Sequence, residues 1–524
     1  FTGTTGDDVF IGAAGVDTVT SNTGTDVILT HKGDDVVTID GVGNKTIDGG
    51  IGTDSLTISV SGISNLGGYT ISTSGDYLVL TDANGNAIQH KNMESLTVGS
   101  YSYTEDTSND TFWNSTEKVV YMYDGGNTSS GELSGFTSSP SSNFSLMGSG
   151  GDDYMNLNID RSSELTGTMT VSMGDGSDTV GASRFKNGDS VDMGAGDDNV
   201  YLYVTNSSGT PALSALSMAK LDGGAGSDTL GFGSMGSQGS TELTLTAGGA
   251  VNFENITGSG GADIIRGDAG NNALRGDDGD DTIYGGDGND ALAGWFMQSG
   301  TTAASFNDSD MKSNSTDSSR NSNDTLYGQA GNDLLVGTYG NNTLDGGAGA
   351  DTIYSGSGSD TIVLRVGDGG STLALADTIT DFTDGTDVLG LDDDLQYTDL
   401  TIAQGTGSNS SDTIISAGSE YLAILTGINV SDINYFDFAS MATGNQSFTG
   451  TTGDDVFIGA AGVDTITTNT GTDIVLASSG NDVITIDGVG NKTIDGGSGT
   501  DSLTISVSGI SSLGDYTPTA SGDY

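Results

Sequence analysis

The chain has 524 residues, of which 86 are Gly, 3 are Pro and 33% are apolar. This composition excludes collagen and argues against one large globular core, whereas a thin solenoid needs only one buried residue per short strand. The formal net charge is −57, from 71 acidic and 14 basic residues, which argues against nucleic acid and anionic membranes as partners. The absence of Cys excludes disulfides and thiol chemistry. The sequence also lacks a run of 18 apolar residues that would predict a membrane span.

Residues 1–57 contain nine-residue units, the first of which begins at Gly3. The units read GTTGDDVFI, GAAGVDTVT, SNTGTDVIL and THKGDDVVT, then a ten-residue variant, DGVGNKTIDG, and then GGIGTDSLT. The Gly-rich hexapeptide of each unit can adopt the positive φ values of a tight turn and bring carbonyl oxygens close to a cation, and the Asp that ends it adds a hard anionic oxygen. The other three residues predict a very short strand with one side chain pointing inward.

These features predict a β-roll at residues 1–57 in which each hexapeptide is a calcium turn. Two units make one coil of a flattened right-handed solenoid, and coils stack about 4.8 Å apart with calcium between neighbouring turns. In the ten-residue variant, Lys45 stands at position 6, where the other units have Asp. Its turn should lack a full set of calcium ligands, because a cation there would compete with the ion. The expected ligands, at position 6 of the unit, are Asp8, Asp17, Asp26, Asp35 and Asp54. The expected inward residues are Phe10 or Val9, Val19, Ile28, Val37, Ile47 and Leu56.

The nine-residue frame is lost over residues 58–146 and returns only in single turns over residues 147–257. Alternating apolar residues at 57–60, 77–80 and 119–123 predict strands, and residues 82–85 predict a hairpin turn. A separate β domain and widened solenoid coils fit residues 58–146 equally well. Residues 147–257 predict a β-helix of larger coils that each keep one calcium turn. Its expected ligands, 25, 20 and 30 residues apart, are Asp153, Asp178, Asp198 and Asp228.

Residues 258–363 form a second predicted roll, in which GSGGADIIR, GDAGNNALR, GDDGDDTIY and GGDGNDALA follow without a slip in frame. Each unit has Gly at position 4, Asp or Asn at position 6 and an aliphatic residue at position 8. This pattern resembles the G-G-x-G-x-D-x-U-x repeat of RTX proteins, which implies an all-β, right-handed parallel β-roll that binds several Ca2+ ions. The expected ligands in this roll are Asp263, Asn272, Asp281, Asp290, Asp324, Asp333, Asn342, Asp351 and Asp360.

Residues 294–318 interrupt the second roll, but the frame is intact before and after them. An insertion of this kind must leave and re-enter the solenoid at one turn, so we expect a surface loop. We interpret Trp295 and Phe296 as residues that pin this loop to the flank of the roll, and a partner-binding anchor is the alternative.

Residues 364–440 resemble the segments that close RTX blocks with conventional antiparallel β-strands, and we expect them to cap the roll because a bare solenoid end exposes an unpaired coil. Residues 441–447 are expected to be a linker. Residues 448–524 then repeat residues 1–77 with a period of 447 and 15 differences. The chain is therefore expected to be a slice of a longer tandem polypeptide. The expected ligands in this copy are Asp455, Asp464, Asp473, Asp482 and Asp501.

The sequence carries no recognisable catalytic constellation. Its only histidines, His31 and His90, are far apart, and it has neither an H-E-x-x-H nor a G-x-S-x-G motif, so we expect no enzymatic activity. The leading hypothesis is a secreted calcium-binding structural protein of the bacterial surface or extracellular matrix, such as an S-layer, fibre or adhesin stalk. The alternative is the RTX scaffold of an enzyme, toxin or ligand-binding adhesin whose active module lies outside this chain.

The expected partners follow from the same reasoning. The duplication favours self-association into a layer or filament, and a cell-surface glycan or lipopolysaccharide is a further candidate ligand. The resemblance implies export by type I secretion, whereas neither nucleic acid binding nor membrane insertion is expected.

Overall fold

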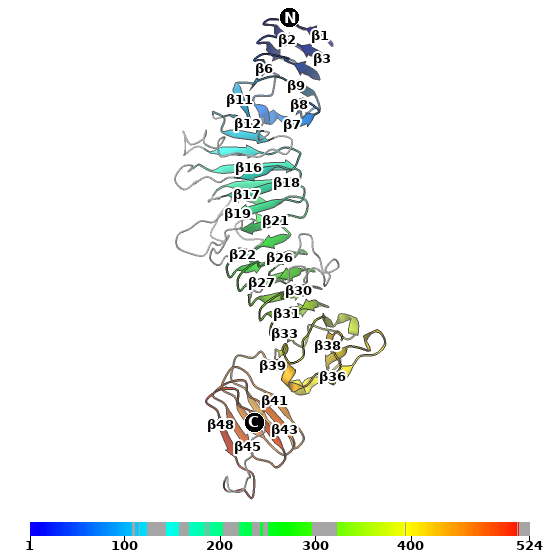
Figure 1. Ribbon diagram of the computed structural model, residues 1–524, viewed down its shortest axis with the longest axis vertical. Helices are drawn as coiled ribbons and strands as arrows, with labels where there is room; N and C mark the ends of the chain where they lie inside the picture. The colour runs from blue at the N-terminus through cyan, green and yellow to red at the C-terminus, as the bar shows by residue number, and fades with distance from the viewer. Residues whose placement is uncertain are drawn as a thin grey trace. The chain divides into compact units, whose positions relative to one another are not determined.

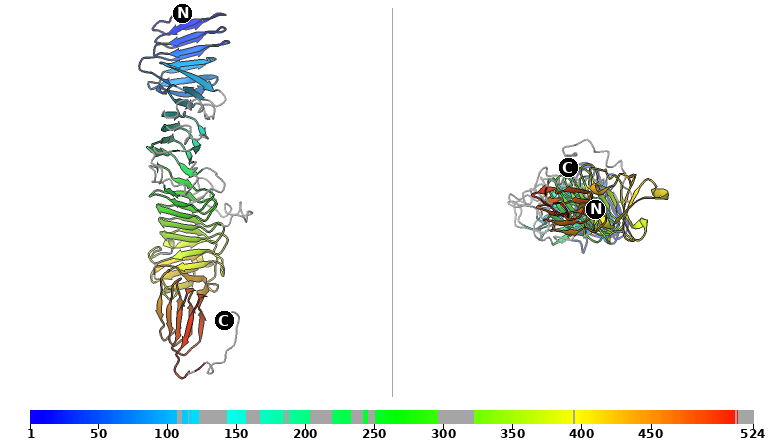
Figure 2. Two further views of the ribbon diagram at one scale, coloured as in Figure 1. Left: turned by 90° about the vertical axis from the view of Figure 1, so that its left-hand side faces the viewer. Right: turned by 90° about the horizontal axis from the view of Figure 1, so that it is seen from below.

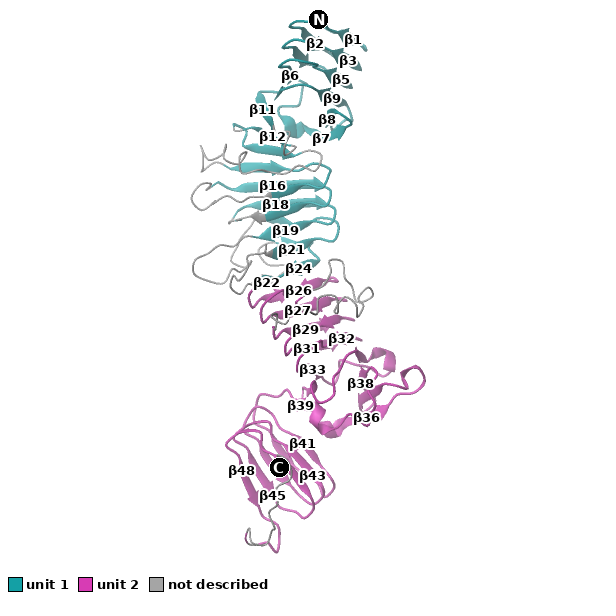
Figure 3. Ribbon diagram, in the orientation of Figure 1, with its two compact units in different colours: residues 1–259 teal, residues 260–524 magenta. Residues whose placement is uncertain are grey.

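The computed structural model divides the chain into two compact units, residues 1–259 and 260–524 (Figure 3). Both units are built of short, mostly parallel strands, and the expected fold class, an all-β parallel β-roll with antiparallel segments, is confirmed. Among the described residues, no helix has the length and apolar character needed to cross a membrane. The described residues are 1–106, 111–114, 116–122, 143–156, 167–183, 185, 188–202, 219–232, 242–244, 250–295, 322–393, 395–510 and 512.

Unit 1 begins with coils whose strands alternate between two sheets (Figure 1). The first strands pair in parallel with the strands 18 residues later, as in Val9↔Val27 and Val19↔Val37, because two nine-residue units complete one coil. Where a coil contains the ten-residue variant the spacing is 19, as in Val37↔Leu56. The strands of one sheet are β1 (Val9–Ile11), β3 (Asp26–Leu29), β5 (Lys45–Asp48), β9 (Ala87–Lys91), β8 (Tyr77–Asp82) and β7 (Tyr69–Ser74). The other sheet starts with β2 (Thr18–Ser21), β4 (Val36–Ile39), β6 (Ser55–Ile58) and β10 (Ser95–Val98).

The side chains expected to point inward from the first roll are buried, and of the pair Phe10 or Val9 it is Phe10 that is partly buried while Val9 is exposed. The described residues between 58 and 122 widen these coils. The strands β5 and β6 pair in parallel with β9 and β10. Antiparallel strands are inserted beyond them, because β9 pairs with β8 and β8 with β7, and β10 pairs with β11 (Tyr101–Asp106). The predicted hairpin turn joins β8 to β9, and Asp82 accepts hydrogen bonds from the backbone N–H groups of Asn84 and Asn86.

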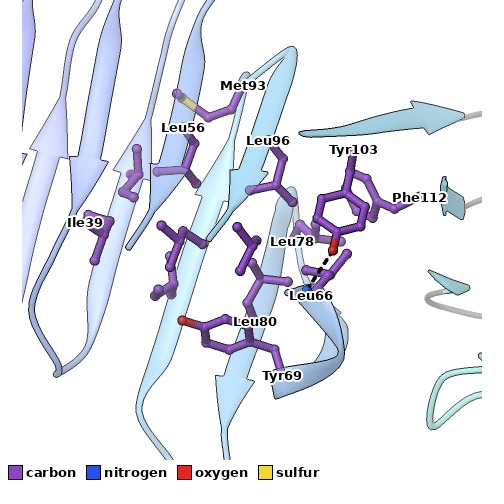
Figure 4. Packing of buried hydrophobic residues seen from close by; sticks show 14 of the residues in the cluster. Ile39, Leu56, Leu66, Tyr69, Leu78, Leu80, Met93, Leu96, Tyr103 and Phe112 are labelled. Carbon is purple, nitrogen blue, oxygen red and sulfur yellow. Dashed lines mark hydrogen bonds between the residues drawn. The ribbon is translucent and has the colours of Figure 1, made fainter. Parts of the chain in front are cut away.

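The widened coils share one core with the first roll. Its residues include Ile39 and Leu56 from the parallel strands and Leu80, Leu96 and Tyr103 from the inserted ones (Figure 4). The 3-10 helix η1 (Leu66–Gly68) closes this core, and the Leu66 N–H donates a hydrogen bond of 3.0 Å to the Tyr103 hydroxyl. The inserted strands are therefore part of the solenoid interior.

The rest of unit 1 is a β-helix of larger parallel coils. The second sheet continues with β12 (Thr111–Asn114), β13 (Val119–Met122), β14 (Phe144–Met147), β16 (Met169–Asp175), β18 (Ser190–Ala195), β20 (Lys220–Asp222) and β23 (Ala250–Val251). The strands on another side of the coils are β15 (Tyr154–Asn156), β17 (Thr179–Ser183), β19 (Asn199–Leu202), β21 (Thr229–Phe232) and β24 (Asn255–Thr257), and β22 spans Glu242–Thr244.

Unit 2 begins with the second roll, in which strands again alternate between two parallel sheets (Figure 2). One sheet contains β25 (Ile264–Arg266), β27 (Thr282–Asp287), β29 (Thr325–Ala330), β31 (Thr343–Ala348), β33 (Thr361–Leu364), β35 (Val388–Leu391) and β39 (Phe438–Ser440). The other contains β26 (Ala273–Arg275), β28 (Ala291–Ala293), β30 (Leu334–Val336), β32 (Thr352–Tyr354) and β34 (Asp377–Ile379), followed by β38 (Glu420–Leu425), β37 (Thr413–Ala417) and β36 (Leu400–Gln404).

Residues 364–440 extend both sheets of this roll and add an antiparallel meander, β36-β37-β38, at its end. Four short 3-10 helices accompany these strands in the described part of unit 2: η4 (Leu373–Leu375), η5 (Tyr397–Asp399), η6 (Gly407–Asn409) and η7 (Tyr435–Asp437). The repeated segment then forms a third roll. Its strands are β40 (Ser447–Thr449), β41 (Val456–Ile458), β42 (Thr465–Thr468), β43 (Asp473–Leu476), β44 (Ser479–Gly480), β45 (Val483–Ile486), β46 (Lys492–Asp495), β47 (Ser498–Gly499) and β48 (Ser502–Ile505).

Candidate calcium sites

The predicted position-6 residues form hydrogen-bonded ladders along the solenoid. In the second roll, the backbone N–H of Asp263 donates to Asp281 Oδ1 at 2.7 Å, and the N–H of Asp281 donates to Asp324 Oδ1 at 2.9 Å. Because each residue starts a strand directly after a turn, its side chain points toward the same turn of the preceding coil. One ladder of this roll contains Asp263, Asp281, Asp324, Asn342, Asp360 and Asp387, and the other contains Asn272, Asp290, Asp333, Asp351 and Asp377.

The same position-6 ladder recurs in the other solenoid segments. In unit 1 its members are Asp8 and Asp26; Asp17, Asp35, Asp54 and Glu94; and Asp153, Asp178, Asp198, Asp228 and Glu254. In the third roll its members are Asp455 and Asp473; and Gln446, Asp464, Asp482 and Asp501. The structure thus places every sequence-predicted site residue in a ladder.

Several ladder members were missed by sequence reasoning. Glu94, Glu254, Asp377 and Asp387 each accept the backbone N–H of the preceding member, 40, 26, 26 and 27 residues earlier. These residues close coils that are longer than two nine-residue units, so a search for the nine-residue frame does not find them. A local signal remains in the sequence, since each acidic residue is followed two positions later by an aliphatic one. Asp189 shows the same signal and accepts the N–H of Met169.

The second oxygen of many ladder carboxylates has no hydrogen-bond partner. Oδ1 accepts the backbone N–H, whereas Oδ2 is buried without a hydrogen bond, which is costly for an anionic oxygen. A bound cation would remove this cost. The residues with such an Oδ2 are Asp35, Asp54, Asp178, Asp198, Asp228, Asp281, Asp290, Asp333, Asp351, Asp360, Asp482 and Asp473, the last of which is ion-paired with Lys492.

Where position 1 of the unit is glycine, as it is before Asp54, Asp228, Asp281, Asp290, Asp333 and Asp351, the space beside the Oδ2 atom is kept open. A Cβ atom placed on Gly276 would lie 2.0 Å from Asp281 Oδ2 and 2.6 Å from the carbonyl oxygen of Gly294. A Cβ on Gly328 would lie 2.4 Å from both Asp333 Oδ2 and the carbonyl oxygen of Gly346. We call this space, between a position-1 glycine, the ladder Oδ2 and a carbonyl of the next coil, the cradle.

The cradle fits calcium because it offers carboxylate and carbonyl oxygens, which are the ligands that calcium prefers. Each coil contributes one carboxylate, and the other oxygens come from the backbone. For this reason no group of three or more His, Cys, Asp or Glu side chains converges within the described part of the chain. The residues that would hold the ions are the ladder carboxylates and the turn carbonyls.

Burial raises the pKa of several ladder carboxyl groups. It raises that of Asp281 to about 9, with the charges of Asp324 and Asp263 adding to the effect, and that of Asp290 to about 7. Without a cation, these groups would hold protons near neutral pH, and a divalent ion would favour their ionised form. Asp26 is an exception. Burial by itself raises its pKa too, but hydrogen bonds from Ser21 and Asp8 together with Lys45 bring the pKa below the ordinary value.

A second ladder, at position 5 of the unit, was also missed. Here the side-chain oxygen accepts a hydrogen bond from the backbone N–H of the next coil. In the position-6 ladder, by contrast, the side-chain oxygen accepts from the backbone N–H of the preceding coil. The Asn289 N–H donates to Asn271 Oδ1, and the Asn332 N–H donates to Asn289 Oδ1, at 2.9 and 2.8 Å. The recurring Asp or Asn at position 5 is the sequence signal by which this ladder could have been predicted. The acceptors are Asp7, Asp34, Asp152, Asp197, Asn271, Asp280, Asn289, Asn323, Asn332, Asn341, Asn445, Asp454 and Asn481.

The structure describes the start of the expected loop in the second roll and the whole of the expected linker before the third roll. The Trp295 ring lies 6.3 Å from that of Tyr339 on the flank of the second roll, while Phe296 and the rest of the loop to residue 318 fall outside the described residues. Residues 441–447, expected as a linker, supply Asn445 and Gln446 to the position-5 and position-6 ladders of the third roll. The segment therefore forms part of the solenoid.

Comparison with known proteins identifies the repeats. The family described as RTX calcium-binding nonapeptide repeat (4 copies) matches residues 2–37, 257–292, 320–338, 327–362, 336–369 and 449–484. No curated protein matches the sequence. Among solved structures, the extracellular lipase LipA from Serratia marcescens aligns with 13% identity and a TM-score of 0.18 over 82% of this chain. That alignment spans only 39% of the lipase, and a similarity this weak does not bear on function. The family matches lie in the three rolls whose carboxylates form the ladders, and the chain therefore contains RTX calcium-binding nonapeptide repeats.

Proposed function

We propose that this chain is a structural protein of the bacterial cell surface or extracellular matrix, a calcium-loaded solenoid repeated in tandem with a period of 447 residues. It would act as part of a surface layer, fibre or adhesin stalk and would catalyse no reaction. RTX repeat proteins are typically secreted, which agrees with this role. Calcium held in the cradles would also offset much of the net charge of −57.

The observation that carries the proposal is that the chain begins its own fold a second time. Strands β41 and β43 of the third roll pair in the register Val456↔Ile474, which corresponds to Val9↔Val27 in the first roll after a shift of 447 residues. The copy is joined to the preceding segment, because Gln446 donates its N–H to Asp464 Oδ1 as the first member of a ladder. A solenoid that is restarted in register can be extended by adding copies.

The first coil of the copy is also covered. Strand β41 contacts β39 and η5 of the preceding segment, and Ile458 is only 5% exposed. Its counterpart in the first roll, Ile11, is 64% exposed. Residues 364–440 therefore protect the start of the next roll as well as the end of the second one, as a connector between repeated solenoids must do.

Self-association into a layer or filament is the partner interaction that we propose, with a cell-surface glycan or lipopolysaccharide as the material to which the assembly attaches. The acidic chain offers no basis for nucleic acid binding or for insertion into a membrane.

Calcium depletion tests the proposal. We expect the β-sheet circular dichroism signal and the assembled species in sedimentation velocity to appear at millimolar calcium and to disappear in EGTA, because the carboxylates lining the turns then repel one another. Calcium should restore both, whereas equimolar magnesium should not, because magnesium keeps its waters and requires a smaller octahedral site. Full β structure in EGTA, with ion removal verified by elemental analysis, would overturn the calcium role. A monomer that stays dispersed at high protein concentration and millimolar calcium would overturn the structural role.

A further inference from the structure

The turn at Lys45, and its counterpart at Lys492 in the copy, differ from the other ladder positions in the described part of the chain, because a cationic side chain stands there. Lys45 begins β5 and is paired with Asp26 of β3 in the parallel register. Its side chain is fully buried, and that of Asp26 is 2% exposed. A buried ammonium group requires compensating acceptors, since desolvation of an isolated charge is expensive.

All the donors of this ammonium group have acceptors. Lys45 Nζ lies 3.0 Å from Asp26 Oδ2 and donates to the carbonyl oxygens of Gly24 at 2.5 Å and Val42 at 3.5 Å. An ammonium group has three N–H donors, so this set is complete. One carboxylate oxygen and two backbone carbonyl oxygens from adjacent coils are also the oxygen types that line the cradle. The ammonium group thus binds oxygen atoms of the same types as those that a calcium ion would use.

The carboxylate beneath Lys45 is correspondingly satisfied. Asp26 Oδ1 accepts the N–H of Asp8, and Oδ2 accepts the Ser21 hydroxyl in addition to its ion pair with Lys45. The Asp26 N–H, which would donate to a ladder carboxylate, donates instead to the Asn44 carbonyl oxygen. Asp26 is therefore absent from the group of carboxylates with an unpartnered Oδ2.

The hydroxyl at position 1 contributes to this difference. Ser21 donates to Asp26 Oδ2, whereas Thr30, at position 1 of the next unit, donates to the Gly49 carbonyl oxygen and Asp35 Oδ2 remains buried without a partner. Asp26 therefore differs from Asp35 both in this hydroxyl and in the lysine on the following coil.

The copy reproduces the ion pair and one of the two carbonyl contacts, whereas the hydroxyl of Thr468, which replaces Ser21, has no partner. Lys492 is paired with Asp473 in the same register, its Nζ lies 2.7 Å from Asp473 Oδ2, and it donates to the carbonyl oxygen of Gly471 at 2.8 Å. The two side chains are 6% and 0% exposed. By contrast, the pair Lys220 and Asp192 is more than 40% exposed and is an ordinary surface ion pair.

We propose that the ammonium groups of Lys45 and Lys492 occupy the place that calcium takes in the other turns, so that one coil in each copy closes without a metal ion. This inference rests on the proposed function, because it presumes calcium in the remaining cradles. It also sets a boundary inside each roll, since the coil closed by lysine does not respond to the calcium concentration.

Crystals of the full chain grown at saturating calcium test the inference through the anomalous scattering of calcium. We expect peaks beside Asp35, Asp281 and Asp290, and none beside Asp26 or Asp473, where Nζ should remain. Calcium beside Asp26 with the lysine displaced would overturn this inference and leave the proposed function standing. No calcium beside any ladder carboxylate would overturn both.

A matched pair of variants provides the test in solution. At saturating calcium, Lys45→Met should lower the midpoint of thermal unfolding, because it leaves Asp26 buried without its counter-charge. Lys32→Met, on an exposed lysine of the same roll, should leave the midpoint unchanged. Equal midpoints for the two variants would overturn the inference, and if Lys45→Met does not fold, the anomalous map of the unaltered chain decides.

Discussion

Glycine at position 1 of a calcium turn is required by space rather than by backbone conformation. Gly276 does not have a positive φ angle, in contrast to Gly279 three residues later in the same turn, where φ is 120°. Glycine is required at position 276 because a Cβ atom there would clash with Asp281 Oδ2 and the Gly294 carbonyl oxygen, which line the cradle. Two glycines of one turn therefore have different physical roles.

Gly276→Ala should fill one cradle. We expect the free energy of unfolding to fall by about 1–3 kcal/mol, as for other overpacked sites, and the calcium content to fall by about one ion per chain. Chemical denaturation and elemental analysis in calcium check these two outcomes. Gly444→Ala is the control, because a Cβ at Gly444 has no neighbour within 4 Å. Unchanged calcium content in Gly276→Ala would show that the cradle does not hold the ion.

The raised pKa values of the ladder carboxyls predict the pH dependence of the calcium-free chain. A carboxyl whose pKa is higher in the folded state than in the unfolded state stabilises the fold fully below the unfolded value, about 3.9, and loses this contribution as pH rises through the folded value. For Asp290 and Asp281 the folded values are about 7 and about 9. In EGTA, acidification from about pH 9 to about pH 5 should therefore recover β-sheet circular dichroism. Asp281→Asn should weaken this dependence, and loss of β signal on acidification would contradict the prediction.

At the scale of the elements, the nine-residue frame predicts the rolls because turn, ligand and inward residue recur at fixed positions. The buried side chains of Val19, Ile28 and Leu56 follow directly from that spacing. The same reasoning fails where coils lengthen, because their closure depends on contacts between distant residues. The acidic residue and the aliphatic residue two positions later mark Glu94 as a candidate ligand, but they do not indicate that its carboxylate receives the Asp54 N–H from 40 residues earlier.

The inserted strands of the first roll depend on one such distant contact. The Tyr103 hydroxyl accepts the Leu66 N–H at 3.0 Å and donates to Glu117 Oε2 at 2.6 Å. Tyr103→Phe leaves the buried Leu66 N–H without an acceptor and should lower the free energy of unfolding of unit 1 by about 1–3 kcal/mol. Hydrogen exchange of the Leu66 amide reports the change locally. Tyr101→Phe, on a partly buried ring of the same strand, should have a smaller effect, and equal effects would contradict the role of the hydroxyl.

At the scale of the whole molecule, the internal duplication allows the same sequence to be compared in two structural environments. The segment FTGTTGDDVFIGAAGVDT occurs twice with no difference, so local propensity is the same in both places. Burial is not the same: Ile458 and Ala460 are buried, whereas Ile11 and Ala13 are exposed. Sequence reasoning predicts the coil in both copies, but it cannot predict which copy has a covered face, because that depends on the residues packed against it.

A single substitution made in each copy measures the effect of this cover. Ile458→Ala removes a side chain that is packed beneath the preceding segment and should lower the free energy of unfolding of its roll by about 2–5 kcal/mol. Ile11→Ala changes the corresponding side chain where it faces solvent, and should stay within about 0.5 kcal/mol. Hydrogen exchange in calcium, followed on strands β1 and β41, resolves the two rolls separately. A large effect of Ile458→Ala together with a negligible effect of Ile11→Ala would show that residues 364–440 stabilise the roll that follows them. Equal effects would show that each roll holds its first coil alone, and the proposed role of this segment as a connector between repeats would fall.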